Sequence, residues 1–298
     1  MAWRLSGQGC AVLVPDNIGQ GERVAMGHHD VVAPFRCGCS LQGLIVMETI
    51  GWLRWAQMDG RFDKKRIAAI GNSGGGTLTL FLGALCRDDL AALSSSGYPS
   101  SFAFIAAKEK THCHCNILPG IVGNLQMWQL YGCFGPKPLF LFQGQNDHLF
   151  PEDLFHMVCR RTALAYSMYG SAPAFRSAIF SGGHPWDNDR RIALATFLAD
   201  SLGLDTASEP AHFPEKGPGN CYAAWPEEAL TTDELTTQIT GVSACEKDEL
   251  YKVYLPGLES YQNTDFGRVC FKQLAAQLQA FLSPVMRSSN KPNAHDGL

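Results

Sequence analysis

The sequence predicts an α/β protein with a doubly wound, mostly parallel sheet and helices on both of its faces. Short apolar runs alternate with longer helical segments five times, at the spacing of β–α–β units. Parallel strands that are buried on both faces are nearly continuous apolar runs, and the short runs have this character. One of them leads through a glycine-rich turn, residues 71–76, straight into a helix.

The first half of this domain is expected to hold three strands. Residues 10–15 are a valine-rich apolar run, and the apolar segment 41–58 is typical of a helix packed against a sheet. A second strand is expected at 66–70, and a helix follows the glycine-rich turn at 77–86. The third strand is expected at 90–96.

The second half begins with an irregular stretch, 98–120, which we interpret as an insertion over a site. A fourth strand at 138–143 leads to a helix at 152–168, whose apolar side chains form one stripe. A fifth strand at 175–180 leads to a closing amphipathic helix at 187–202. The alternation of strand and helix ends there.

The domain boundary is therefore expected near Asp205, so that residues 1–204 form the α/β domain. Residues 205–222 contain several prolines and glycines and are interpreted as a linker. Residues 223–284 are expected to be a C-terminal extension with one helix near its end. The polar tail, 285–298, is expected to be disordered.

The composition is that of a globular protein able to bury a core. Of the 298 residues, 46% are hydrophobic and 17% are charged, and the net charge is −4. This charge provides no footprint for nucleic acid or an anionic membrane, so neither is expected as a partner. No apolar run approaches the roughly 18 residues that a membrane-spanning helix needs. Met1 to Gly9 lack the plan of a signal peptide, and we expect a cytoplasmic location.

The eleven cysteines are expected to be mostly packed, free thiols in a reducing compartment. Two clusters, Cys37–Gly38–Cys39 and the HCHC run at 112–115, leave a zinc site or a disulfide open as alternatives. Structural zinc sites usually separate their paired cysteines by two to four residues, unlike these clusters. We therefore expect no metal and no cofactor.

Ser73 is the candidate nucleophile, because it stands in a G-x-S-x-G pattern between a strand and a helix. A sharp turn at this place strains the serine backbone and exposes the hydroxyl at the carboxyl end of the sheet. The N–H of Gly74 lies at the positive end of the helix and can stabilise an oxyanion. An ordinary glycine-rich turn is the alternative. A phosphate-binding loop is disfavoured, because no G-x-x-x-x-G-K-[ST] pattern is present.

A base and an acid follow the next expected strands in the order that this fold class requires. Asp147 comes after the strand at 138–143, and His184 lies in the small-residue loop after 175–180. The expected role of His184 is to deprotonate the serine, and that of Asp147 is to hold the imidazolium. The alternatives are a turn aspartate and a surface histidine. Competing groups are Asp153 and Asp187, which capping of helices explains, and His148, which is expected to face away.

At these residues the chain resembles the α/β-hydrolase superfamily, and more narrowly its dienelactone-hydrolase and acetyl xylan esterase-like branch. The resemblance lies in AVLVPDNIGQGER, GNSGGGT, HCHCNILPGI, PLFLFQGQNDHLFP and SGGHPWD, over about residues 10–203. It implies a serine hydrolase of carboxylic esters, including acetyl esters of carbohydrates. The catalytic residues would be Ser73, Asp147 and His184, with Gly74 in the oxyanion hole.

The chain departs from that superfamily before residue 10. Members usually have about three more strands there, and a loop that supplies a second oxyanion N–H. The expected sheet is thus N-terminally shortened, and an exposed edge would favour association of the chain with other copies. This departure keeps a non-catalytic relative that acts as a binding module open as an alternative. A serine peptidase is a further alternative, because it would share the triad and the G-x-S-x-G-G pattern permits it. No substrate-binding residue is assigned.

Overall fold

The computed structural model describes residues 1–28, 34–35, 38–107 and 112–204. The chain divides into two units, Met1–Lys247 and Asp248–Leu298, and all described residues belong to the first. The predicted linker, extension and tail at 205–298 lie outside the described residues. The predicted domain boundaries therefore stay a prediction.

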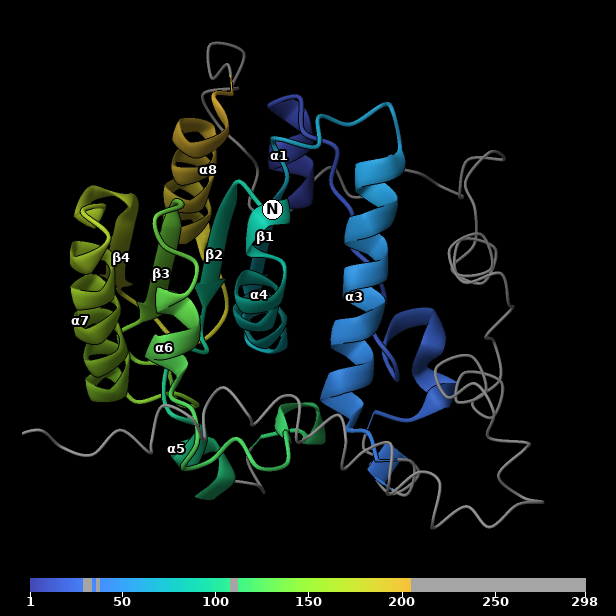
Figure 1. Ribbon diagram of the computed structural model, residues 1–298, viewed down its shortest axis with the longest axis vertical. Helices are drawn as coiled ribbons and strands as arrows, with labels where there is room; N and C mark the ends of the chain where they lie inside the picture. Colours follow the sequence, from blue (N-terminus) through green and yellow to red (C-terminus); the bar gives the residue numbers. More distant parts are fainter. Residues whose placement is uncertain (29–33, 36–37, 108–111, 205–298) are drawn as a thin grey trace, which may run out of the picture. The chain divides into compact units, whose positions relative to one another are not determined.

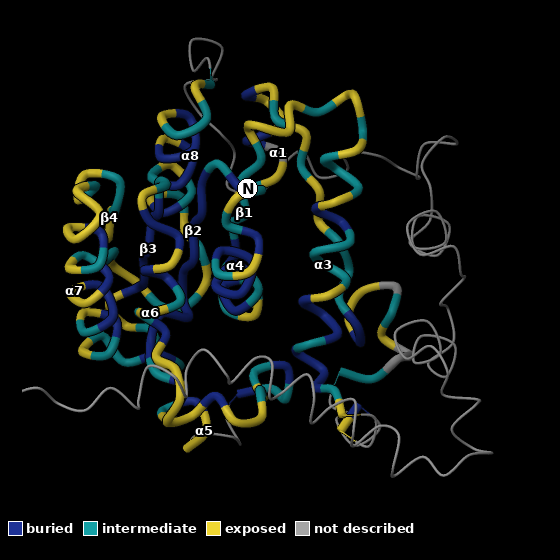
Figure 2. Tube along the Cα trace, viewed as in Figure 1, coloured by how far each residue is buried: buried dark blue, intermediate teal, exposed yellow. Residues whose placement is uncertain are grey.

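The described residues contain one parallel sheet of four strands, ordered β1–β2–β3–β4 (Figure 1). Their bounds are Ala68–Asn72, Ala92–Ser96, Leu139–Gly144 and Phe175–Phe180. β2 and β3 are buried along their whole lengths, as Figure 2 also shows. All four strands point the same way, so their carboxyl ends meet at one edge of the sheet.

Helices cover both faces of this sheet, which confirms the predicted fold class. On one face, Leu139 and Leu141 of β3 share a core cluster with Leu80 of α4 and Val158 of α7. On the other face, Phe140 and Phe142 pack with Phe197 of α8. Successive side chains of β3 thus alternate between two clusters, as expected for a strand whose sheet is covered by helices on both faces. The helices have the bounds α1 Ala2–Gly7, α3 Leu41–Met58, α4 Gly74–Leu85, α5 Phe102–Ala107, α6 Met127–Gly132, α7 Glu152–Met168 and α8 Asn188–Leu202.

The predicted strand at 10–15 is wrong. These residues pair with no strand of the described chain, and Leu13 and Val14 are 43% and 73% exposed. Cys10 and Val12 pack instead beside the cluster that contains Leu5 of α1. An apolar run becomes a strand only where a neighbour offers backbone hydrogen bonds, and β1 pairs with β2 alone among the described residues.

The irregular stretch at 98–120 also has more structure than predicted. It contains α5 and a short 3₁₀ turn, η3, at His114–Asn116, and the unpredicted α6 follows it. Further 3₁₀ turns are η1 at Gly21–Met26, η2 at Arg87–Asp89 and η4 at Ala172–Ala174. Among the described residues, no helix has the length and the apolar character that crossing a membrane requires.

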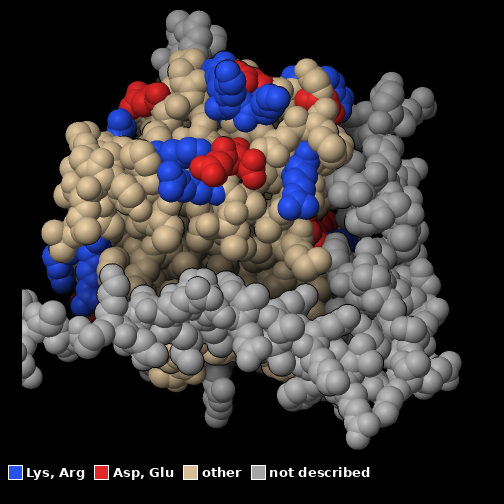
Figure 3. Space-filling model, in the orientation of Figure 1, with Lys and Arg blue, Asp and Glu red and all other residues tan. Residues whose placement is uncertain are grey.

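Charged side chains of both signs are mixed on the face seen in Figure 3. Basic and acidic groups lie next to one another on its upper half, among uncharged residues. Ion pairs among the described residues include Arg61 with Asp59 and Arg176 with Asp200. Exposed pairs of this kind each contribute little to stability.

Candidate active site

Ser73 occupies the turn that joins β1 to α4 and has a strained backbone. Its φ is 57° and its ψ is −119°, and it is the only non-glycine residue with a positive φ among those described. Its N–H donates to the carbonyl of Ser96 at 3.0 Å, which ties the turn to the end of β2. A side chain on Gly71 would overlap the backbone of Gly75, so the close approach of strand and helix requires glycine.

Asp147 and His184 meet beyond the carboxyl ends of β3 and β4. His184 Nδ1 lies 2.8 Å from Asp147 Oδ2, and the Asp147 side chain is fully buried. The other carboxylate oxygen accepts hydrogen bonds from the N–H groups of Leu149 and Phe150, at 2.9 and 3.3 Å. Burial alone would raise the pKa of Asp147, but the hydrogen bond from His184 and these N–H groups outweigh it and lower this pKa.

The second ring nitrogen of His184, Nε2, is buried and has no hydrogen-bond partner among the described residues. Ser73 Oγ is therefore not hydrogen-bonded to it in this structure. The two residues are linked through Asn72, whose Nδ2 donates to the His184 carbonyl at 3.4 Å. In enzymes without substrate, catalytic hydrogen bonds are often long or absent and form only in the complex.

A hydrogen-bond chain fixes this corner of the site. Trp186 Nε1 donates to Ser96 Oγ at 2.6 Å, and Ser96 Oγ donates to Asn72 Oδ1 at 2.8 Å. A Cβ on Gly97 would lie 2.9 Å from His184 Cε1, so the imidazole packs directly on the backbone that follows β2. The position of the imidazole is thus set by β2 as well as by its own loop.

Arg190 of α8 holds the loop that carries His184, and the sequence analysis missed it. Its guanidinium is almost fully buried and donates to the carbonyls of Ser181, Gly183 and Pro185 at 2.7, 2.6 and 2.5 Å. A buried arginine that satisfies three carbonyls on both sides of one residue restricts that loop to one conformation.

A cavity of about 310 Å³ opens beside Ser73. Its lining includes Ser73, the N-terminal residues of α4 and four amide side chains of the N-terminal half. Gln42, in the first turn of α3, is 2% exposed, and its Nε2 has no partner among the described residues. The lining residues are Asn17, Gln20, His28, Gln42, Ile45, Asn72, Ser73, Gly74, Gly75, Leu78 and Cys115.

Three other residues, Asp153, Asp187 and His148, compete in the sequence with the predicted acid and base. Asp187 caps α8 by accepting the N–H of Arg190 at 3.0 Å, and Asp153 lies in the first turn of α7. The expectation that His148 faces away is wrong, because its ring centroid is 6.2 Å from that of His184, edge to face. His148 follows Asp147 directly, and its ring is a neighbour of the imidazole that Asp147 contacts.

The expectation of free, packed thiols is wrong for one pair of cysteines. Cys113 and Cys115 form a disulfide across η3, with Cα atoms 5.4 Å apart, a separation that disulfides commonly span. His28 lies beside this pair, with Nε2 at 3.3 Å from Cys113 Sγ. Cys37 lies outside the described residues. The expectation thus failed where a short turn brings two cysteines together.

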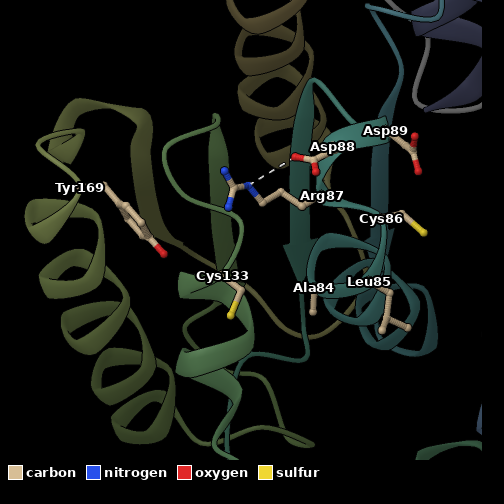
Figure 4. A pocket seen from close by; sticks show the side chains of 8 residues that line it. All are labelled: Ala84, Leu85, Cys86, Arg87, Asp88, Asp89, Cys133 and Tyr169. Carbon is tan, nitrogen blue, oxygen red and sulfur yellow. Dashed lines mark ion pairs between the residues drawn. The ribbon is translucent and has the colours of Figure 1, made fainter. Parts of the chain in front are cut away.

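A second hollow lies at the C-terminal end of α4, the opposite end of that helix from Ser73. Figure 4 shows the side chains that line it. This hollow has a volume of about 410 Å³ and contains an exposed ion pair between Arg87 and Asp88, 3.9 Å apart. None of the predicted catalytic residues lines it. The cavity beside Ser73 is therefore the candidate active site.

No protein-family model and no curated protein sequence matches this chain. Among solved structures, the methylesterase BT1017 has a TM-score of 0.49 and 17% identity, over 92% of this chain and 53% of that one. A glucuronoyl esterase of carbohydrate esterase family 15, from Caldicellulosiruptor kristjansonii, has a TM-score of 0.47 and 15% identity, over 55% and 50%. The esterase Pf2001 of Pyrococcus furiosus has a TM-score of 0.42 and 14% identity, over 53% and 62%.

This chain spans about half the length of the first two of these structures. All three are named as esterases.

Proposed function

We propose that this protein is a serine hydrolase of carboxylic esters. The observation that carries the proposal is the hydrogen bond between His184 and the buried carboxylate of Asp147, at the same sheet edge as the strained turn of Ser73. In this mechanism Ser73 attacks the ester carbonyl while His184 takes its proton. His184 then protonates the leaving alcohol, and a water that it activates releases the acid from the acyl-enzyme.

Asp147 acts through His184. A carboxylate that accepts Nδ1–H keeps Nε2 unprotonated and directed away, which is the state that a general base needs. The lowered pKa of Asp147 keeps this carboxylate ionised at neutral pH. The imidazolium that forms during attack is then stabilised by a charge that is already in place.

The oxyanion would be stabilised by the N–H of Gly74 and by the side-chain amide of Gln42. Gly74 is the first residue of α4, so its N–H has no acceptor within the helix. Gln42 lines the same cavity, and its Nε2 is buried without a partner among the described residues. A side-chain amide would thereby serve as the second oxyanion donor.

The cavity favours an ester with a polar, hydroxyl-bearing alcohol part, such as an acetylated carbohydrate. The amides of Asn17, Gln20 and Asn72 in its lining both donate and accept hydrogen bonds. Hydroxyl groups, which also do both, can satisfy such amides at several orientations.

The test is release of p-nitrophenol from p-nitrophenyl acetate, followed by a panel of acetylated sugars. A burst of about one equivalent per chain and steady turnover are expected from the wild type, and neither from Ser73→Ala. Ser167→Ala, an exposed serine on α7, is the matched control and keeps both. Absence of turnover from a folded wild type favours the binding module. Cleavage of peptide anilides in place of esters favours the peptidase.

A further inference from the structure

A cluster of metal-binding side chains stands in the wall of the cavity beside Ser73. Single ligand atoms of His28, Cys113 and Cys115 all lie within 4.8 Å of one another. The residues come from segments 85 positions apart, and both His28 and Cys115 line the cavity. We propose that these three side chains bind a thiophilic divalent cation, Zn²⁺ above all, when the Cys113–Cys115 disulfide is reduced.

The imidazole of His28 is oriented as a metal ligand would be. Its Nδ1 lies 2.9 Å from the carbonyl oxygen of Ile18. A carbonyl oxygen can only accept a hydrogen bond, so Nδ1 must be the donor and carries the hydrogen. Neutral His28 therefore presents an unprotonated Nε2 to Cys113 Sγ. In zinc sites, the histidine ring nitrogen that does not bind the metal commonly donates to a backbone carbonyl in this way.

The backbone around His28 is held firmly. Ile18 is 1% exposed, so the accepting carbonyl belongs to a segment anchored in the core. Gly19 has a φ of 77°, and a Cβ there would overlap the backbone of His28. The loop thus passes directly over His28 and restricts where its ring can lie.

The distance between nitrogen and sulfur is close to that in a zinc site. Zinc lies about 2.3 Å from sulfur and about 2.0–2.1 Å from nitrogen, which in a tetrahedron puts the two ligand atoms about 3.6 Å apart. His28 Nε2 and Cys113 Sγ are 3.3 Å apart.

Asn116 supplies the outer layer of the site. Its Nδ2 lies 3.8 Å from Cys113 Sγ and 3.7 Å from Cys115 Sγ, and its Oδ1 accepts from Thr77 Oγ1 at 3.1 Å. The threonine fixes which way the amide faces, so that the donor side faces both sulfurs. N–H donors of this kind stabilise the charge of metal-bound thiolates.

The redox step that opens the site is balanced by an external dithiol. Two electrons and two protons from the dithiol convert the Cys113–Cys115 disulfide to two thiols, and the dithiol becomes a disulfide. Binding of the cation then releases both thiol protons to solvent. Three protein ligands leave one tetrahedral position for water or substrate, which is the arrangement of an open rather than a closed zinc site.

The experiment measures metal binding to the full chain without any ester. Chelator-stripped protein is reduced with a phosphine, desalted and titrated with Zn²⁺ against a chromophoric chelator, and Co²⁺ is used to record the thiolate-to-metal absorption. The reduced wild type is expected to bind one Zn²⁺ tightly, and the oxidised wild type much more weakly.

Variants assign the site, because the chain has other cysteines. Cys115→Ser and His28→Ala are expected to lose this binding, while Cys133→Ser, an exposed cysteine on α6's C-terminal side, retains it. Asn116→Ala leaves all three ligands present and is expected to weaken binding about 10–100-fold. Equal Zn²⁺ affinity in the reduced wild type and in Cys115→Ser, or no thiolate-to-Co²⁺ absorption in the reduced wild type, overturns the proposal. Since no ester is used, its failure is independent of the esterase proposal.

Discussion

Asp147 has the two properties that the acid of a triad needs, and both come from its position after β3. Its side chain is fully buried, and its two oxygens are shared between His184 and the N–H groups of the following turn. Burial alone would make the neutral acid more favourable, but the donors reverse this effect and lower the pKa. In the proposed mechanism, this carboxylate therefore affects both the stability of the domain and catalysis.

Asp147→Asn is expected to reduce kcat by about 10²–10⁴-fold, because an asparagine does not stabilise the His184 imidazolium. Steady-state ester hydrolysis measures this. Asp153→Asn, an exposed aspartate in the first turn of α7, is the matched control and is expected to keep wild-type kcat. Wild-type turnover in Asp147→Asn would remove this residue from the mechanism.

The same variant changes the pH dependence of unfolding. Because the pKa of Asp147 is lower in the folded state than its unfolded value of about 3.9, its ionisation stabilises the fold above that pH. The contribution is lost as the pH falls through the lower folded pKa. Denaturant melts between pH 3 and 6 should show a shallower acid decline for Asp147→Asn than for the wild type.

Substitution of Gln42 tests whether its side-chain amide is the second oxyanion donor. Removal of one donor typically lowers kcat by about 10²–10³-fold, and we expect this loss in Gln42→Ala with little change in KM. Gln57→Ala, at the other end of the same helix, is expected to retain kcat. A change in KM alone would assign Gln42 to substrate binding.

The turn between β1 and α4 shows how an element positions a side chain. The strand ends at Asn72, the helix begins at Gly74, and Ser73 between them takes a backbone conformation that its neighbours enforce. Gly71 permits this because its missing Cβ leaves room for the backbone of Gly75. The backbone conformation of residues 72–74 is therefore determined by packing, independently of any catalytic role.

Gly71→Ala is expected to destabilise the domain by about 1–3 kcal/mol, because the added methyl overlaps backbone that cannot move without shifting α4. Thermal and urea unfolding measure the loss. Gly60→Ala, where a Cβ meets no atom within 4 Å, should change stability little. Equal stability of the two variants would show that the turn is not under this constraint.

α8 acts on the site through Arg190, which reaches three carbonyls of the loop before the helix. Arg190→Met should cost about 2–4 kcal/mol of stability, since the buried carbonyls lose charged donors. It should also lower kcat under conditions where the protein is folded, because His184 is then less well oriented. Arg160→Met, an exposed arginine on α7, is the control for both readouts.

Sequence patterns predicted elements well where chain periodicity and burial agree. The bounds predicted for α7 and β4 match the structure, because a clear turn flanks each of them. The run at 10–15 failed because apolar composition does not say whether a partner strand exists. Arg190 and His28 were missed because a single basic residue has no periodic signal, and its partners lie elsewhere in the chain.

At the scale of the molecule, the site is assembled by the parallel sheet itself. Ser73, Asp147 and His184 follow β1, β3 and β4, whose carboxyl ends lie at one edge. This is why the positions of the three residues could be predicted from the sequence, whereas the cavity wall formed by the N-terminal segments could not. Near the end of the described residues, Leu202 and Gly203 are bound to Arg66, which donates to their carbonyls.

The boundary near residue 205 stays a prediction, which truncation of the chain tests. A chain ending at Leu204 contains every residue of the candidate site and every contact described between the sheet and its helices. It should unfold cooperatively within about 4 °C of the full chain, which corresponds to about 1 kcal/mol for a domain of this size. Calorimetry measures this, and a truncated chain without a cooperative transition would contradict the boundary.

In the proposed ester hydrolysis, everything depends on Ser73 being the nucleophile. The most direct test is intact-mass analysis after treatment with a fluorophosphonate, followed by digestion to locate the adduct. We predict one adduct per chain on the peptide that contains Ser73, and none in Ser73→Ala. A folded wild type that remains unlabelled, or a label on a different serine, would contradict the account.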